Sequence, residues 1–78
     1  MEPNISFTYE GKRYSVSHEA YDLDRIVLPD GRVLQVEAWK EISPPQPVGL
    51  REVPTVFSSN TPEDIATLMN GVVAEEVA

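Results

Sequence analysis

Two short turn signals, each flanked by apolar and polar residues in alternation, constrain the fold of this chain more than any other feature. The first is Glu10-Gly11, within an alternating pattern over residues 5–16. Alternation is typical of strands with one buried face, and glycine in a two-residue connection supplies the positive φ that tight hairpins need. Pairing Tyr9 with Lys12 predicts a hairpin whose apolar residues share one face. Those residues are Ile5, Phe7, Tyr14 and Val16.

The second signal, Pro29-Asp30-Gly31, predicts a hairpin over residues 25–38. Proline at the second turn position and glycine at the fourth suit a type I turn followed by a bulge. A two-residue loop would set Ile26 opposite Gln35 and split the apolar residues between both faces, whereas a three-residue loop sets Ile26 opposite Leu34. We predict the second register because it gathers apolar side chains on one face. That face would hold Ile26, Leu28, Leu34, Val36 and Ala38.

Between and after the hairpins, the chain predicts a connector, a loop and one further strand. Residues 17–24 are polar and acidic and predict a connector with at most one helical turn. Residues 43–49 predict an extended, polyproline-like loop, because proline does not fit a central strand or a helix interior. Residues 50–57 predict a strand, which Pro54 restricts to the edge of a sheet or to a bulge.

The last part of the chain predicts a helix over residues 61–70. Asn60 or Thr61 can cap it, Pro62 suits the first helical position, and the acidic residues that follow favour the positive end of the helix dipole. Asn70-Gly71 predicts its end, so residues 72–78 either fray or extend the helix. An apolar stripe at helical spacing would cover the open face of the sheet. It consists of Ile65, Leu68, Met69 and Val72.

Together these elements predict an α+β fold. The expected architecture is a small, curved antiparallel sheet of two hairpins plus an edge strand, forming a roll or SH3-like barrel, with a C-terminal helix. The length of 78 residues predicts one domain over residues 1–78.

The charge balance argues against nucleic acid as a partner. The chain has 6 Lys and Arg against 13 Asp and Glu, a formal net charge of −7, whereas neutralising phosphates requires clustered basic residues. No stretch approaches the roughly 20 apolar residues that span a bilayer, and the polar first residues do not resemble a signal peptide. The absence of cysteine fits a reducing compartment. We therefore expect a cytoplasmic protein that binds neither nucleic acid nor membrane.

Nothing in the sequence predicts catalysis or a cofactor. There is no cysteine nucleophile, only one histidine, and no glycine-rich loop to hold a phosphate. The acidic connector 18–24 is an alternative site for a metal ion or ligand, although its spacing matches neither an EF-hand nor a zinc motif. We predict no metal site there. The candidate ligands would be His18, Glu19, Asp22 and Asp24.

The tryptophan and the prolines that follow it form the candidate partner-binding surface. Ser43 to Pro47 contains a P-x-x-P pattern, which preorganised grooves recognise at low entropic cost. Alternatively, the prolines stiffen a crossover and Trp39 packs beneath it. We predict a small non-catalytic interaction module or accessory subunit, whose partner is another protein or a second copy of this chain; the alternative is a metal- or ligand-binding protein using residues 18–24. The predicted partner-binding residues are Trp39, Pro44, Pro45 and Pro47.

Overall fold

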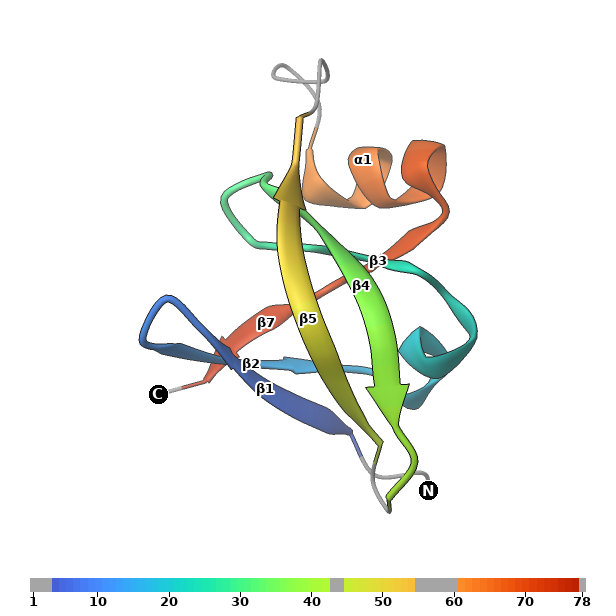
Figure 1. The fold of residues 1–78 in the computed structure, drawn as a ribbon. Coiled ribbons are helices and arrows are strands. Elements are labelled where there is room, and N and C mark those ends of the chain that lie inside the picture. Colours follow the sequence, from blue (N-terminus) through green and yellow to red (C-terminus); the bar gives the residue numbers. More distant parts are fainter. Residues whose placement is uncertain (1–3, 43–44, 55–60, 78) are drawn as a thin grey trace.

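The computed structural model describes residues 4–42, 45–54 and 61–77. Figure 1 shows the long strands β4 and β5 crossing in front of β2, with β1 beside the lower part of β5 and α1 at the other end of the molecule. The strands are β1 (Ile5–Tyr9), β2 (Lys12–Val16), β3 (Arg25–Val27), β4 (Val33–Lys40), β5 (Gln46–Val53), β6 (Gly71–Val73) and β7 (Glu75–Val77). The helices are the 3-10 helix η1 (His18–Asp22) and the α-helix α1 (Pro62–Met69).

These elements form an α+β fold with two sheets instead of the single sheet predicted. One sheet has the order β1-β2-β7 and the other the order β5-β4-β3-β6. Every pairing is antiparallel except that of β3 with β6. Within the residues that the structure describes, the sheets do not close into a barrel, so an SH3-like barrel is not confirmed.

The first hairpin has the predicted register. Tyr9 lies opposite Lys12, and Phe7 opposite Tyr14, where their rings stack with centroids 5.5 Å apart. Glu10 and Gly11 have φ values of 52° and 80°. Both turn residues are therefore left-handed, which matches the twist of the flanking strands.

The second hairpin also has the predicted register, with Ile26 opposite Leu34. The Gly31 N–H donates to the Leu28 carbonyl at 2.9 Å, and Gly31 has a φ of 96°. Ala38, predicted to share the apolar face of this hairpin, is exposed to solvent. The reason is that β3 lies beside β4 only over the first three residues of β4.

The strand predicted over residues 50–57 lies at a sheet edge as expected, but it begins earlier. β5 begins at Gln46 and contains Pro47. The loop predicted over residues 43–49 is therefore wrong from Gln46 onwards. Residues 43–44 of that loop and residues 55–57 of the predicted strand lie outside the described residues. An edge strand tolerates proline because one side of its backbone has no strand to bond.

The prediction that residues 72–78 fray or extend the helix is also wrong. This segment forms β6, parallel to β3, and β7, antiparallel to β2; Ala78 lies outside the described residues. Between them Ala74 is buried, and its N–H donates to the Val27 carbonyl at 2.8 Å. The tail thus carries the chain from one sheet to the other.

The four-stranded sheet is covered on both faces. On one face, its side chains pack with those of the other sheet in a core made of Ile5, Phe7, Tyr14, Val16, Ala20, Ile26, Leu28, Leu34, Val36 and Ala74. On the other face, α1 covers a smaller core of Val27, Val33, Ile65 and Ala66. The molecule therefore has three layers: helix, sheet and sheet.

The predicted helix over residues 61–70 is confirmed in α1. The Thr61 side chain caps it by accepting a hydrogen bond from the Asp64 N–H at 3.2 Å. Of the predicted stripe, Ile65 and Met69 pack on the sheet, but Leu68 is 58% exposed. Val72, the last residue of the predicted stripe, belongs to β6 and not to the helix. No helix in the described ranges is long and apolar enough to cross a membrane.

One arginine joins both hairpins to β5. The Arg32 guanidinium lies 2.6 Å from Glu10, 2.8 Å from Asp30 and 3.4 Å from Glu52. Partial burial would raise the pKa of Asp30. Hydrogen bonds from the Arg32 backbone N–H and guanidinium outweigh this effect and lower the pKa below its ordinary value of 3.8.

We expect Arg32→Gln to lower the Tm by a few degrees at pH 7 and low salt. Since the pKa of Asp30 is lower in the folded chain, its stabilising effect is present above pH 3.8 and is lost as the pH falls through the folded value. The difference from wild type should therefore shrink at acid pH, and also in about 1 M salt, which screens exposed pairs. Thermal melts of both proteins at pH 7 in low salt, at acid pH and in high salt measure this difference in Tm.

The control is Arg51→Gln, because Arg51 is 65% exposed in its side chain and lies 3.5 Å from Glu37. We expect no measurable change in its Tm. Equal melting of Arg32→Gln and wild type at pH 7 and low salt would contradict the assigned role of Arg32.

Candidate functional site

The far ends of β4 and β5 form a two-stranded ribbon that extends beyond the rest of their sheet. β3 pairs with β4 only up to Gln35, whereas β5 pairs with it up to Lys40. In the ribbon, Trp39 lies opposite Pro47 and Ala38 opposite Val48. Figure 1 shows this end of β4 and β5 at the lower end of the molecule, next to the start of β1. Apolar side chains here have fewer neighbours to cover them than those at the centre of the sheet.

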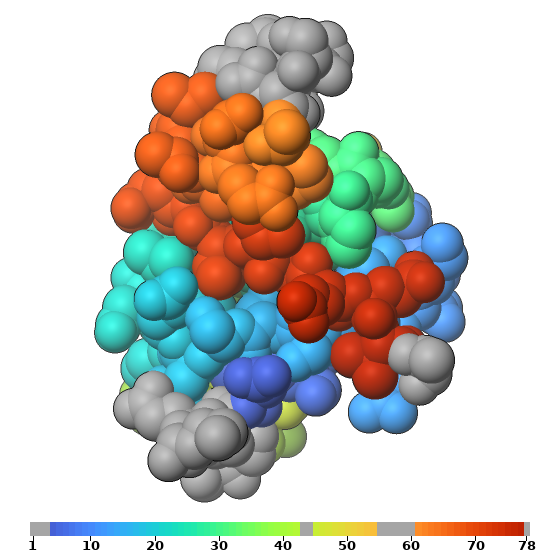
Figure 2. All heavy atoms as spheres, turned by 180° about the vertical axis from the view of Figure 1, so that it is seen from behind, coloured from blue at the N-terminus to red at the C-terminus, as the bar shows by residue number. Residues whose placement is uncertain are grey.

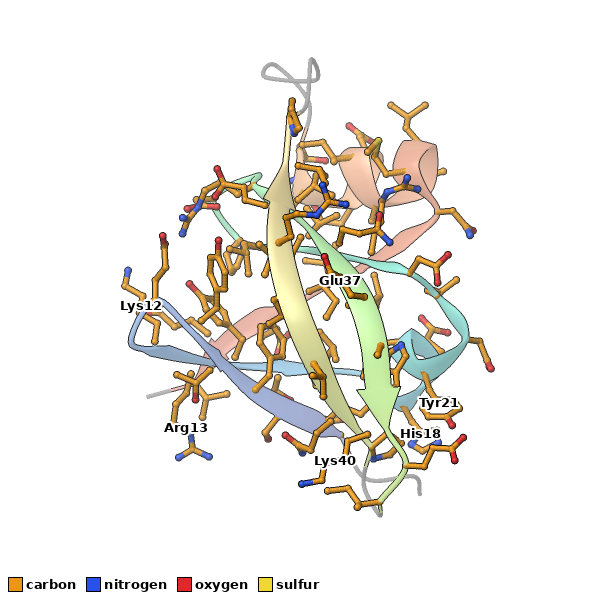
Figure 3. All side chains as sticks on the ribbon, in the orientation of Figure 1. Lys12, Arg13, His18, Tyr21, Glu37 and Lys40 are labelled. Atoms are coloured by element: carbon orange, nitrogen blue, oxygen red, sulfur yellow. The ribbon has the colours of Figure 1, made fainter. Side chains whose placement is uncertain are left out.

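Three aromatic side chains follow one another from η1 to the ribbon. The Tyr21 ring lies 5.7 Å from the Trp39 ring, tilted by 44°, and 6.4 Å from the His18 ring, which is nearly parallel to it. All three side chains are half-buried, and Figure 3 shows His18 and Tyr21 side by side next to the end of β4. We call His18, Tyr21 and Trp39 the aromatic row. Its rings support one another and still present surface to solvent.

A hydrogen bond holds the middle of this row. The Tyr21 hydroxyl donates to Glu41 Oε1 at 3.2 Å. This bond, followed by the negative charge of Glu41 itself, raises the pKa of Tyr21. The hydrogen bond thus ties the middle ring of the row to the residue that follows β4.

The ribbon also carries exposed aliphatic side chains. Ile42, just after β4, and Val48, in β5, are each 48% exposed, although large aliphatic side chains are more often buried. We call this surface the ribbon end. It consists of Trp39, Ile42, Pro47 and Val48.

The structure brings together only part of the predicted partner-binding set. Trp39 and Pro47 are cross-strand partners and both are half-buried, while Pro45 is buried. Pro44 lies outside the described residues. The P-x-x-P pattern is therefore not one continuous loop, because its last proline belongs to β5.

Sequence reasoning missed the contribution of η1 to this surface. His18 and Tyr21 were placed in a connector without a role in partner binding. They are three residues apart, and a 3-10 helix has three residues per turn, so both side chains project on the same side. That spacing was the available signal, but its use required knowing that the connector is a 3-10 helix packed beside β4.

The metal alternative in residues 18–24 has no support in the geometry. Among the residues that the structure describes, no three His, Cys, Asp or Glu side chains lie where they could hold one metal ion. His18 stacks on Tyr21, and Asp24 uses its backbone carbonyl to accept from the Val36 N–H at 2.8 Å. This part of the connector positions aromatic rings and anchors β4.

Comparisons of the chain with protein-family models, curated proteins and solved structures find no match. The function must therefore be inferred from the chain's own geometry.

Proposed function

We propose that this protein is a small, non-catalytic protein–protein interaction module or accessory subunit, acting in the cytoplasm and binding its partner through the ribbon end. The observation that supports this proposal is the aromatic row, which places Trp39 half-exposed on the part of the β4–β5 ribbon that continues beyond β3, opposite Pro47. We also propose that the two sheets act as an open roll that holds the ribbon in place.

Trp39 has the properties of an interface anchor. Tryptophan and tyrosine dominate the binding energy of many interfaces because they bury a large area and lose little conformational freedom. Here Trp39 already packs against Tyr21 and the main core. A partner would therefore add contacts to a ring whose orientation is largely fixed, which reduces the entropic cost of binding.

The nature of the surrounding surface supports a protein partner. Ile42 and Val48 add exposed aliphatic area, while Glu41 and Lys40 provide charged groups at its margin. Apolar centres with polar rims are typical of protein interfaces. A second copy of this chain is the other occupant that such a surface could take.

The test compares affinity capture by wild-type bait and three variants. We expect Trp39→Ala to weaken partner binding at least roughly tenfold, as hot-spot truncation does, and Ile42→Asp to weaken it by placing a charge on the ribbon end. Leu68→Asp is the matched control, because Leu68 is an exposed aliphatic residue on α1. Its bait should capture the same protein as wild type.

Trp39 is the only tryptophan, so its fluorescence measures binding directly once a partner is isolated. We expect its emission to shift to shorter wavelength on binding. Light scattering of the isolated chain detects the second-copy outcome. If Trp39→Ala and Ile42→Asp both fold and retain the partner with unchanged affinity, the ribbon end is not the binding surface.

A further inference from the structure

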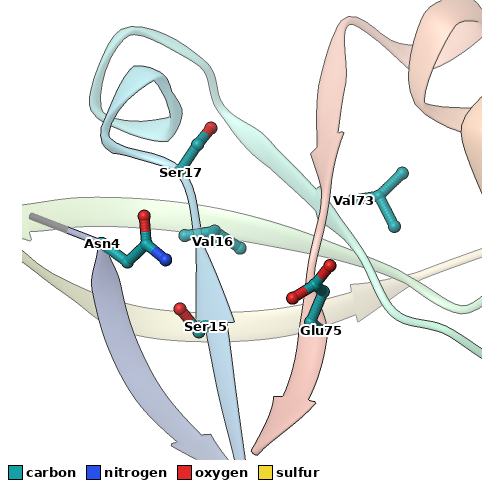
Figure 4. A pocket seen from close by; sticks show the side chains of 6 residues that line it. All are labelled: Asn4, Ser15, Val16, Ser17, Val73 and Glu75. Atoms are coloured by element: carbon teal, nitrogen blue, oxygen red, sulfur yellow. The ribbon is translucent and has the colours of Figure 1, made fainter. Parts of the chain in front are cut away.

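A polar pocket lies where the chain passes from one sheet to the other. The pairing of β2 with β7 ends at Ser15 opposite Glu75, and β6 pairs instead with β3. Beyond that point the chain turns from β2 into η1 at Ser17, while Val73 lies on β6, which pairs with β3. The opening between them has a volume of about 190 Å³, and Figure 4 shows Asn4, Ser15, Val16 and Ser17 on one side of it and Glu75 and Val73 on the other.

The pocket is lined by hydrogen-bonding side chains around an apolar base. Val16 is buried at the base, and Asn4, Ser15, Ser17 and Glu75 surround it. In the described part of the chain, the ion pairs of lysine and arginine involve other carboxylates, so Glu75 has no cation beside it. The pocket therefore carries a net negative charge.

A second, more apolar hollow of about 370 Å³ adjoins the first and shares Val73 and Glu75 with it. Pro29, Pro62 and Ala74 supply its apolar wall, and Glu63 and Glu76 lie along it. Figure 2 shows this face of the molecule, with the β6–β7 segment in red between α1 in orange and β2 in blue. The polar pocket therefore adjoins an apolar wall against which a hydrocarbon chain can pack.

We propose that the pocket binds an alkylammonium group, a primary amine on an aliphatic stem. An ammonium has three donors and no acceptor, which matches the Glu75 carboxylate and the oxygens of Ser15, Ser17 and Asn4. Anions are repelled by Glu75, and a hard cation such as Ca²⁺ takes about six to eight oxygen ligands, more than these four side chains supply. The net charge of −7 favours the approach of cations in general. The pocket uses no residue of the ribbon end.

This chemistry has two sources, the lysine side chain of another protein and a free aliphatic polyamine. Both present an ammonium on a hydrocarbon stem that snorkels along apolar surface. The stem would lie against Val73 and the proline wall, with the ammonium beside Glu75.

The test is an NMR titration of the ¹⁵N-labelled full chain with n-butylammonium, which reproduces the lysine side chain. We expect saturable shifts at the amides of Ser15, Ser17, Val73 and Glu75, and none with n-butanol, the neutral analogue. Glu75→Gln should weaken binding about tenfold or more, as the loss of a charged hydrogen-bond partner does. Glu37→Gln is the matched control, since it removes one charge from β4 without touching the pocket.

Ser17→Val is a second variant, because Ser17 is exposed and its side chain does not cap η1; it should weaken binding without affecting folding. Titrations with spermidine and with a lysine-containing glycine peptide distinguish the sources, and tighter binding of either supports the proposal. Absence of saturable shifts, equal shifts with n-butanol, or equal weakening by Glu37→Gln and Glu75→Gln would overturn it.

Discussion

Replacing Leu34 with alanine should lower the free energy of unfolding by about 2–5 kcal/mol, the range for a fully buried leucine. Leu34 has no exposed surface and lies in the core between the two sheets. Its strand is paired on both sides, with Ile26 and Glu52 beside it, so the surroundings have little freedom to collapse into the space left behind. Domains of this size are stable by roughly 5–10 kcal/mol, so the variant should be partly unfolded at modest temperature.

Urea denaturation followed by circular dichroism measures this loss. The midpoint should fall while the slope with urea stays the same, which indicates a change in stability and not in the surface exposed on unfolding. Leu68→Ala is the control, because Leu68 is 58% exposed on α1; its stability should change by no more than about 0.5 kcal/mol. Similar losses in both variants would contradict the three-layer arrangement.

Both hairpins were predictable with their registers because the information lies within a few adjacent residues. Gly11 and Gly31 adopt the positive φ that their turns require, and each turn fixes which residues face one another. Alternation then has only one register that gathers the apolar side chains. The helix was predictable for the same reason, since Thr61 and Asn70 mark its ends locally.

The last strands could not be predicted because their partners lie far away in the sequence. β6 and β7 have three residues each, too few for a pattern, and they pair with β3 and β2 from the first half of the chain. Val72 and Val73 fit an apolar helix as well as a strand. These residues form a strand because the free edge of β3 is available for pairing, and β6 pairs with it.

The residues of the candidate sites also differ in whether the sequence alone could identify them. Trp39 and Pro47 could be selected from their chemistry and their closeness in sequence. Tyr21 could not, because its role depends on the packing of η1 beside β4. The alkylammonium pocket takes Asn4 and Glu75 from opposite ends of the chain, and no local pattern joins them.

Replacing Gly71 with valine should destabilise the protein by about 3 kcal/mol, at the upper end of the range for steric overpacking. Gly71 begins β6 beside Arg25 of β3, and a Cβ there would lie 2.8 Å from the Arg25 carbonyl oxygen. That atom belongs to the backbone and cannot rotate away. Arg25 also donates to the Met69 carbonyl at 3.0 Å, so moving β6 away from β3 disturbs the end of α1 as well.

The direction of this change separates steric packing from strand propensity. Valine favours strands more than glycine does, and Gly71 is not among the residues with positive φ, so propensity alone predicts a gain in stability. Gly11→Asn is the control, because Gly11 has open space around it and asparagine tolerates a left-handed backbone. Hydrogen exchange gives the decisive measurement: the amides of Val72 and Ala74 should exchange faster in Gly71→Val and unchanged in Gly11→Asn. A Gly71→Val protein more stable than wild type would show that β3 and β6 are farther apart than their pairing requires, and that the tail is held mainly by β7.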